Sequence, residues 1–117
     1  MVLSTNGANY LPAICANVFE CLGDGRVGDA LLATERELRV ARAAGFSAVR
    51  FFLHEALHFS RGAAFLDDVS RFLEVFERHG VDVILVLFDA CWRPDLEGAE
   101  PIDGVHNSAM PPPGVSL

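Results

Sequence analysis

Apolar residues along the chain fall into two kinds of run, and the same order of runs occurs twice. In the first copy, a helical pattern is followed by Gly45 and then by the apolar segment 48–53; in the second, Gly80 precedes the apolar segment 83–88. A glycine just past a helix adopts the left-handed conformation that other residues reach only with strain, and near-continuous apolar runs suit strands covered on both faces. The pattern therefore predicts two helix-strand units with parallel strands.

The helix before Gly80 has the clearest period. Apolar residues recur there every three or four positions, as expected for one face of an amphipathic helix: Phe65, Val69, Phe72, Leu73 and Phe76. The opposite face is charged, with spacings such as Asp67 to Arg71 that suit i, i+4 pairs. We interpret that charged face as solvated rather than as a binding patch.

The helix before Gly45 is predicted over residues 30–44. Two starts are open: Asp29 as N-cap, or a capping box formed by Thr34 and Glu37. The remaining expectations are a short strand at 8–11, a long glycine-rich loop at 13–28 and a loop or short helical turn at 54–64.

Together these elements predict an α/β fold of order β-α-β-α-β over residues 8–92, with three parallel strands and two helices. A proline-rich irregular tail follows at 93–117. The chain has 117 residues, 51% of them hydrophobic, which is enough for one small domain and too few for two. In folds built from parallel βα units, active and binding sites form where the strands end, so functional side chains are expected there.

Charge and composition exclude several classes of partner. The formal net charge is −7, there is no lysine, and the arginines are scattered. Nucleic-acid binding rests on a basic footprint, so no nucleic-acid partner is expected. The N-terminus lacks a basic segment followed by an apolar core, and no apolar run approaches the roughly 20 residues of a membrane-spanning helix. We expect a cytoplasmic protein with reduced cysteines and no membrane partner.

The segment 54–58, HEALH, matches the pattern H-E-x-x-H, in which two histidines one helical turn apart bind zinc and the glutamate is a general base. That chemistry requires the motif to lie inside a helix, whereas here it directly follows a predicted strand. The extended form of the motif would also place Gly and His where this chain has Arg61 and Ala64. Zinc hydrolysis is kept as an alternative, and no metal ligand or cofactor is assigned.

Polar side chains occur in and just after the predicted strands. Arg50 interrupts an apolar strand, and a buried guanidinium needs a partner: a carboxylate used only for packing, or an ionised carboxylate in a barrel or cleft. His54 follows the same strand. Asp89 and Trp92 follow the next one, and such a pair suits a polyol site because aromatic faces stack on sugar rings while carboxylates bind hydroxyls. A tryptophan capping the core explains Trp92 equally well.

Four segments follow one another in a specific order: NYLPA at 9–13, ERELRVARAAGFSAVRFFLH at 35–54, FLDDVSRFLEVFERHGVDVILVLFDACW at 65–92 and GVHNS at 104–108. Taken together they resemble the N-terminal portion of cellulase-like glycoside hydrolases, in a subgroup labelled xylanases or cellulases. The resemblance implies part of a (β/α)₈ TIM barrel from the clan that uses two glutamates with retention of configuration. It also implies a β-linked glycan as substrate.

The resemblance implies roles for individual residues. In that clan an arginine on the second strand commonly supports the nucleophilic carboxylate, and the matching residue is Arg50. Residues at the ends of the first three strands line the sugar subsites, and the matching positions are Asn9, Tyr10, His54, Asp89 and Trp92.

The chain departs from the family in one important respect. The clan's acid/base glutamate follows strand four and its nucleophile follows strand seven, while the predicted elements stop after strand three. Retaining hydrolysis needs both carboxylates, so no residue is assigned as catalytic and the chain is expected to be inactive by itself. A full barrel takes roughly 250 residues. The prediction is therefore a single partial domain over residues 1–117, with open sheet edges prone to non-specific self-association.

Two further points stay open. The tail after Ser108 departs from the family, and we hypothesise that the reading frame was lost or the gene cut near this position. The alternatives to a partial glycoside hydrolase are a complete small α/β binding module and a zinc hydrolase that uses the HEALH segment.

Overall fold

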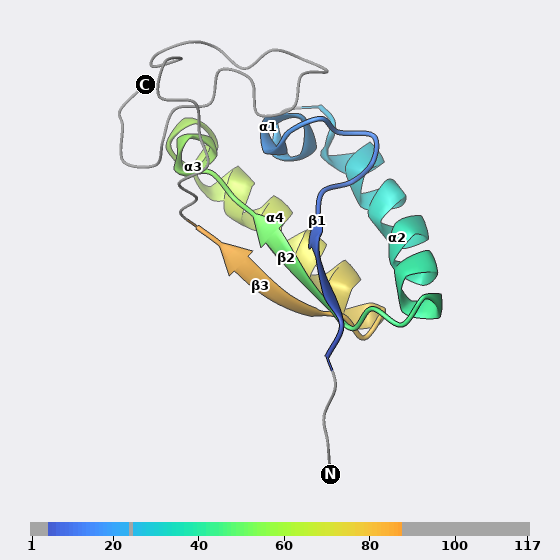
Figure 1. Cartoon of the computed structure of the whole chain (residues 1–117). Coiled ribbons are helices and arrows are strands. Elements are labelled where there is room, and N and C mark those ends of the chain that lie inside the picture. Colours follow the sequence, from blue (N-terminus) through green and yellow to red (C-terminus); the bar gives the residue numbers. More distant parts are fainter. Residues whose placement is uncertain (1–4, 24, 88–117) are drawn as a thin grey trace.

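Three parallel strands form one sheet in the order β1-β2-β3 (Figure 1). The computed structural model describes residues 5–23 and 25–87. Within these ranges the strands are β1 (Gly7–Tyr10), β2 (Ala48–Phe52) and β3 (Asp82–Val86). The prediction of three parallel strands is confirmed, with small differences at the strand ends.

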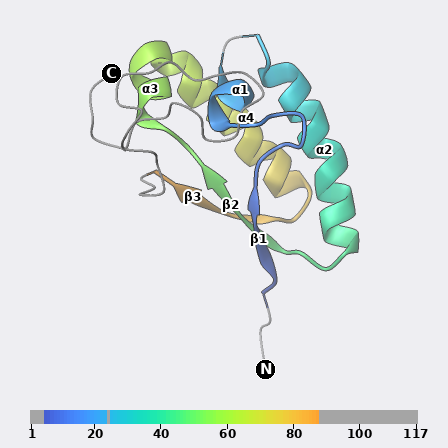
Figure 2. The same ribbon diagram turned by 45° about the horizontal axis from the view of Figure 1, so that its top comes forward.

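The described residues form four helices: α1 (Val18–Leu22), α2 (Val27–Ala43), α3 (Glu55–Arg61) and α4 (Ala63–Arg78). The two crossover helices, α2 and α4, lie on the same face of the sheet, while α1 and α3 lie near the end where the strands finish (Figures 1 and 2). No described helix covers the opposite face, which we call the bare face. The strands were expected to be covered on both faces, and within the described residues they are covered on one.

Both predicted glycine caps are confirmed. Gly45 and Gly80 have backbone φ angles of +94° and +66° and directly follow the C-cap residues of α2 and α4. At each end the glycine N–H and the next N–H donate to carbonyls of the last helical turn, as in a Schellman motif. The left-handed glycine turns the chain back, so each helix leads directly into the following strand.

The prediction of a continuous loop at 13–28 is wrong, because α1 lies inside it. Asn17 caps this helix: its Oδ1 accepts a hydrogen bond from the Glu20 N–H at 3.0 Å. The Glu20 carboxylate in turn accepts from the Ala16 N–H at 2.8 Å. A helix of five residues is too short to show a hydrophobic period, so only this Asn-x-x-Glu spacing could have indicated it.

Helix α2 begins earlier than predicted, and neither of the expected caps starts it. Its N-cap is Arg26, whose side chain makes no capping hydrogen bond. Asp29 lies in the first turn, where a negative charge suits the helix dipole. Thr34 and Glu37 lie inside the helix, where both contact the hydroxyl of Tyr10.

Aromatic side chains fill the space between the sheet and α4. Phe51, Phe72 and Phe76 are fully buried, and the ring of Phe51 lies 5.2 Å from that of Phe72 and 5.5 Å from that of Phe76, measured between centroids. Truncating a buried phenylalanine costs about 3–5 kcal/mol, so these contacts hold α4 firmly against β2. They confirm the apolar face predicted for α4, of which Leu73 is only partly buried.

A buried ion pair joins the short helices to α4. The Arg61 guanidinium lies 2.7 Å from the Asp68 carboxylate, and both side chains are almost completely buried. Arg61 also donates to the carbonyl oxygen of Leu22 at the end of α1. Arg71 contacts the same carboxylate from the surface at 3.2 Å. These contacts fix α1 and α3 beside the strand ends.

Candidate functional site on the bare sheet face

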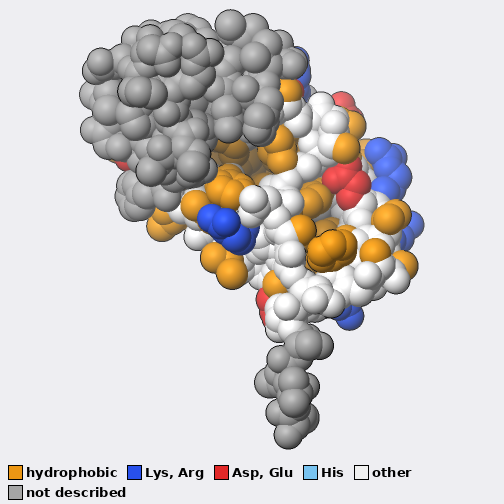
Figure 3. All heavy atoms as spheres, in the orientation of Figure 1, with side chains coloured by type: hydrophobic (Ala, Val, Ile, Leu, Met, Phe, Trp, Pro, Cys, Tyr) orange, Lys and Arg blue, Asp and Glu red, His pale blue; other side chains and the backbone are white. Residues whose placement is uncertain are grey.

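The bare face carries a polar pair next to apolar side chains. Successive side chains of a strand point to opposite faces, and Phe51 packs against α4. Its neighbours Arg50 and Phe52 therefore face the bare side. The strand register places Asn9 beside Arg50 and Ile84 on the other side of it, in one row across the sheet. Figure 3 views the molecule from this side and shows hydrophobic side chains at the surface.

Arg50 makes two contacts within this face. Its Nη1 donates to Asn9 Oδ1 at 3.3 Å, and the guanidinium carbon lies 5.2 Å from the centre of the Phe52 ring. A cation placed over an aromatic ring in this way is attracted by the ring's negative face. Arg50 is exposed, which corrects the expectation of a buried guanidinium: the face on which it lies is uncovered within the described residues. No carboxylate among these residues is found to pair with it.

Tyr10 points to the opposite side of the sheet from Asn9. Its hydroxyl donates to Glu37 Oε2 at 2.7 Å and lies 2.9 Å from Thr34 Oγ1, and its ring packs edge-on against Phe76. Burial, together with the charge of Glu37, raises the pKa of Tyr10 well above its ordinary value, so the phenol stays protonated. This geometry ties β1 to α2. The sugar-binding role implied for Tyr10 stays a prediction.

His54 is buried just beyond the end of β2. It is the N-cap of α3, and its Nδ1 accepts a hydrogen bond from the Ala56 N–H at 3.1 Å. The imidazole ring also packs against Phe19, with 5.1 Å between ring centroids. His54 thus caps α3 and packs against α1. The contact with sugar implied for it stays a prediction.

The zinc alternative does not have the geometry that its motif requires. Glu55 and His58 lie inside α3, but His54 precedes the helix, so the two histidines do not share one helical face. His58 instead packs near the ring of Phe65. Within residues 5–23 and 25–87, no three side chains of His, Cys, Asp or Glu come close enough to hold a metal ion.

The structure therefore brings together two of the predicted site residues, Asn9 and Arg50. Asp89 and Trp92 lie outside the described residues, as does the tail predicted at 93–117. Phe52 is a contact that sequence reasoning missed. The signal for it was the alternation of the second strand, which puts residues 50 and 52 on the same face.

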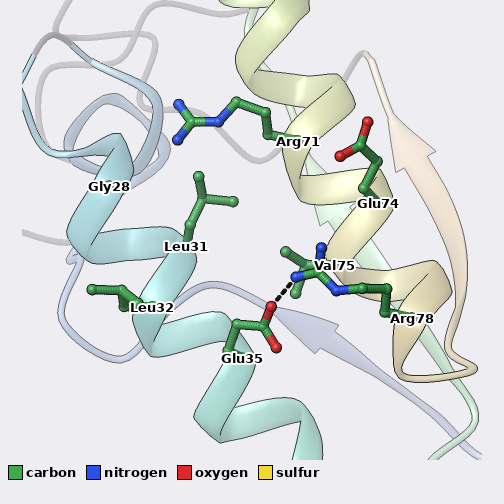
Figure 4. Close-up of a pocket in the computed structure, with 8 residues that line it drawn as sticks. All are labelled: Gly28, Leu31, Leu32, Glu35, Arg71, Glu74, Val75 and Arg78. Atoms are coloured by element: carbon green, nitrogen blue, oxygen red, sulfur yellow. Dashed lines mark hydrogen bonds and ion pairs between the residues drawn. The ribbon is translucent and has the colours of Figure 1, made fainter.

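A groove of about 340 Å³ lies on the other side of the molecule, between α2 and α4 (Figure 4). Sequence reasoning missed it because it depends on how the two helices pack. Its lining is Gly28, Leu31, Leu32, Glu35, Arg71, Glu74, Val75 and Arg78. Glu35 pairs with Arg78 and with His79, and the hydrogen bond from His79, followed by the one from Arg78, lowers the pKa of Glu35. The charges at this end of the groove thus balance one another.

Comparison of the chain with family models, with curated proteins and with solved structures found no match. No helix in the described part of the chain is long and apolar enough to cross a membrane. What the site can do follows from its own chemistry. A guanidinium binds carboxylates, an amide both donates to and accepts from hydroxyls, and an aromatic face stacks on a sugar ring.

Proposed function

We propose that this chain is the N-terminal part of a cellulase-like (β/α)₈-barrel glycoside hydrolase acting on β-linked glycans. The observation that supports the proposal is the topology. The strands follow one another in sequence order, and both crossover helices lie on one face. Doubly wound sheets carry helices on both faces, whereas in a barrel the helices form an outer ring and the other sheet face becomes the interior. The bare face is then the inner wall of the barrel.

The position of the polar pair fits this proposal. Asn9 is the third of the four residues of β1, and Arg50 is the central residue of β2, two positions before the carboxyl end of that strand. Barrel enzymes build their sites at the carboxyl ends of the strands. In the proposed enzyme, Arg50 holds an ionised carboxylate carried by a later strand, and Asn9 binds sugar hydroxyls. Asp82 begins β3, at the opposite end of the strands. It is therefore not assigned a catalytic role, and we propose that the chain alone binds glycan weakly without hydrolysing it.

Titration of the ¹⁵N-labelled chain with cellotetraose and xylotetraose tests this by NMR. The expected result is weak binding, with a Kd on the order of 1 mM, and shifts centred on Asn9 and Arg50. Arg50→Gln should weaken binding about tenfold or more, because it removes the charge and the cation–π contact. Arg39→Gln is the matched control, since Arg39 is exposed on α2. Shifts confined to the helix layer, or none at about 20 mM sugar, would contradict the proposal.

A complete small α/β binding module is the second candidate, and one observation favours it. The buried apolar residues between the sheet and the helices form a single connected cluster, as in a domain that folds by itself. Thermal unfolding distinguishes the two candidates. A sharp two-state transition with equal calorimetric and van't Hoff enthalpies supports the module, whereas a broad transition supports the partial barrel.

A further inference from the structure

The outer edge of β3 is unusually apolar for an edge strand. β3 pairs with β2 on one side, and among the residues that the structure describes no strand pairs with its other side. Ile84 is 59% exposed, Leu85 36%, and Leu87, directly after the strand, 54%. Natural edge strands are usually protected by lysine, proline or a bulge. The sequence of β3, DVILV, contains neither lysine nor proline, and its one charge is Asp82.

The other edge of the sheet is a poorer template for pairing. β1 is a four-residue strand of sequence GANY. Glycine and asparagine are depleted in strands, whereas the valine and isoleucine of β3 are among the strongest strand formers. Strand addition is therefore expected at β3 rather than at β1.

We infer that β3 pairs antiparallel with β3 of a second copy, forming a closed dimer whose two-fold axis passes beside Ile84. This pairing is self-complementary. Ile84 faces Ile84 of the second copy, and Asp82 faces Val86. The two aspartates are then about 14 Å apart at 3.4 Å per residue. That separation exceeds the Debye length of about 8 Å at physiological salt, so their repulsion is small.

The charge of Asp82 also favours antiparallel over parallel pairing of the two β3 strands. In-register parallel pairing would place the two Asp82 side chains directly side by side, where like charges are destabilising. Antiparallel pairing further sets Leu85 opposite Val83 of the second copy, which covers an exposed leucine with an apolar partner. Between two copies of this chain, the interaction is then a specific two-fold contact rather than non-specific self-association.

The inference does not depend on the proposed function. Arg50 is the neighbour of Ile84 on β2, and Asn9 lies one strand further from the dimer axis. Edge pairing adds a strand beside β3 in the plane of the sheet and does not cover the bare face, so the polar pair stays accessible in the dimer. A chain that binds no glycan can still dimerise through β3, and a monomeric chain can still bind glycan. The two proposals therefore fail independently.

Light scattering coupled to size-exclusion chromatography tests the dimer. The full chain at about 50 μM should have the mass of a dimer, which corresponds to a Kd in the micromolar range or below. Ile84→Lys should reduce the mass to that of a monomer at the same concentration, because two like charges then meet at the axis. Ile84 is exposed, so the change leaves the core intact. Leu32→Lys is the matched control: Leu32 is 61% exposed on α2 and its substitution should not alter the dimer.

A mixing experiment tests the register. Ile84→Lys and Ile84→Glu should each be monomeric alone, and an equimolar mixture should restore the dimer because opposite charges face one another. A monomeric wild type overturns the inference. So does a dimer that persists in Ile84→Lys, a mixture that stays monomeric, or a mass that keeps growing with concentration. Circular dichroism of each variant confirms that it is folded.

Discussion

Removing the phenolic oxygen of Tyr10 tests the role that the structure gives to this residue. In Tyr10→Phe the ring keeps its packing against Phe76, but the hydroxyl contacts with Glu37 and Thr34 are lost. A hydrogen bond to a charged group contributes about 1.5–3 kcal/mol. Glu37 still accepts from the Ala13 N–H at 2.9 Å, so its carboxylate keeps one partner and the lower half of that range applies. The free energy of unfolding should fall by about 2 kcal/mol.

Urea unfolding measures this change. With an m-value of about 1–2 kcal/mol per molar, a loss of 2 kcal/mol lowers the urea midpoint by about 1–2 M. A double-mutant cycle with Glu37→Ala isolates the contact itself, and we expect a coupling energy of about 1 kcal/mol or more. A coupling energy below about 0.3 kcal/mol would show that the hydroxyl of Tyr10 does not hold β1 to α2.

The pH dependence gives a second readout of the same contact. The ordinary pKa of tyrosine is 10.0, and burial raises that of Tyr10 well above it in the folded chain. The unfolded chain therefore loses this proton near pH 10 while the folded chain keeps it. The stabilisation is fully present below that pH and declines as the pH rises further. Tyr10 is the only tyrosine, so Tyr10→Phe should show a smaller loss of stability between about pH 9 and about pH 11. Equal losses would count against the raised pKa.

The same urea assay checks two matched pairs of substitutions. An added methyl group meets no atom within 4 Å at Gly80 or at Gly28. Gly80→Ala should lower the free energy of unfolding by about 1–2 kcal/mol, because the φ of Gly80 is +66° and an alanine there is strained. Gly28→Ala, inside α2, should raise the free energy of unfolding by about 0.5–1 kcal/mol. Asp68→Ala should cost about 3 kcal/mol, because the buried Arg61 loses its carboxylate. Arg71 also pairs with Asp68, but its side chain is 55% exposed, so Arg71→Ala should lower the free energy of unfolding by less than about 1 kcal/mol. Equal effects within either pair would contradict the packing described.

The helix-strand units could be predicted because their signals are local. Gly45 and Gly80 mark helix ends through a backbone conformation that few other residues adopt, and α4 is long enough to show its apolar face. Helix α1 has too few residues for a period and was missed. The capping box expected from Thr34 and Glu37 was also wrong, because both side chains hydrogen-bond instead to Tyr10, which is distant in sequence.

The site was only partly predictable, because side-chain direction in a short strand depends on its pairing. Asn9 and Tyr10 are adjacent in sequence, yet one contacts Arg50 on the bare face and the other contacts Glu37 on the helix face. Only the register with β2 decides between these faces. His54 likewise could be recognised as an N-cap only once the start of α3 was known.

The most direct test of the proposed barrel is the DNA sequence downstream of the codons for residues 104–108, translated in all three frames. A barrel of this family should have a fourth strand followed by Asn-Glu, at the position where the resemblance places the acid/base glutamate, encoded beyond the segment 104–108. If no frame contains such a segment, the proposal that this chain is part of a glycoside hydrolase barrel is contradicted.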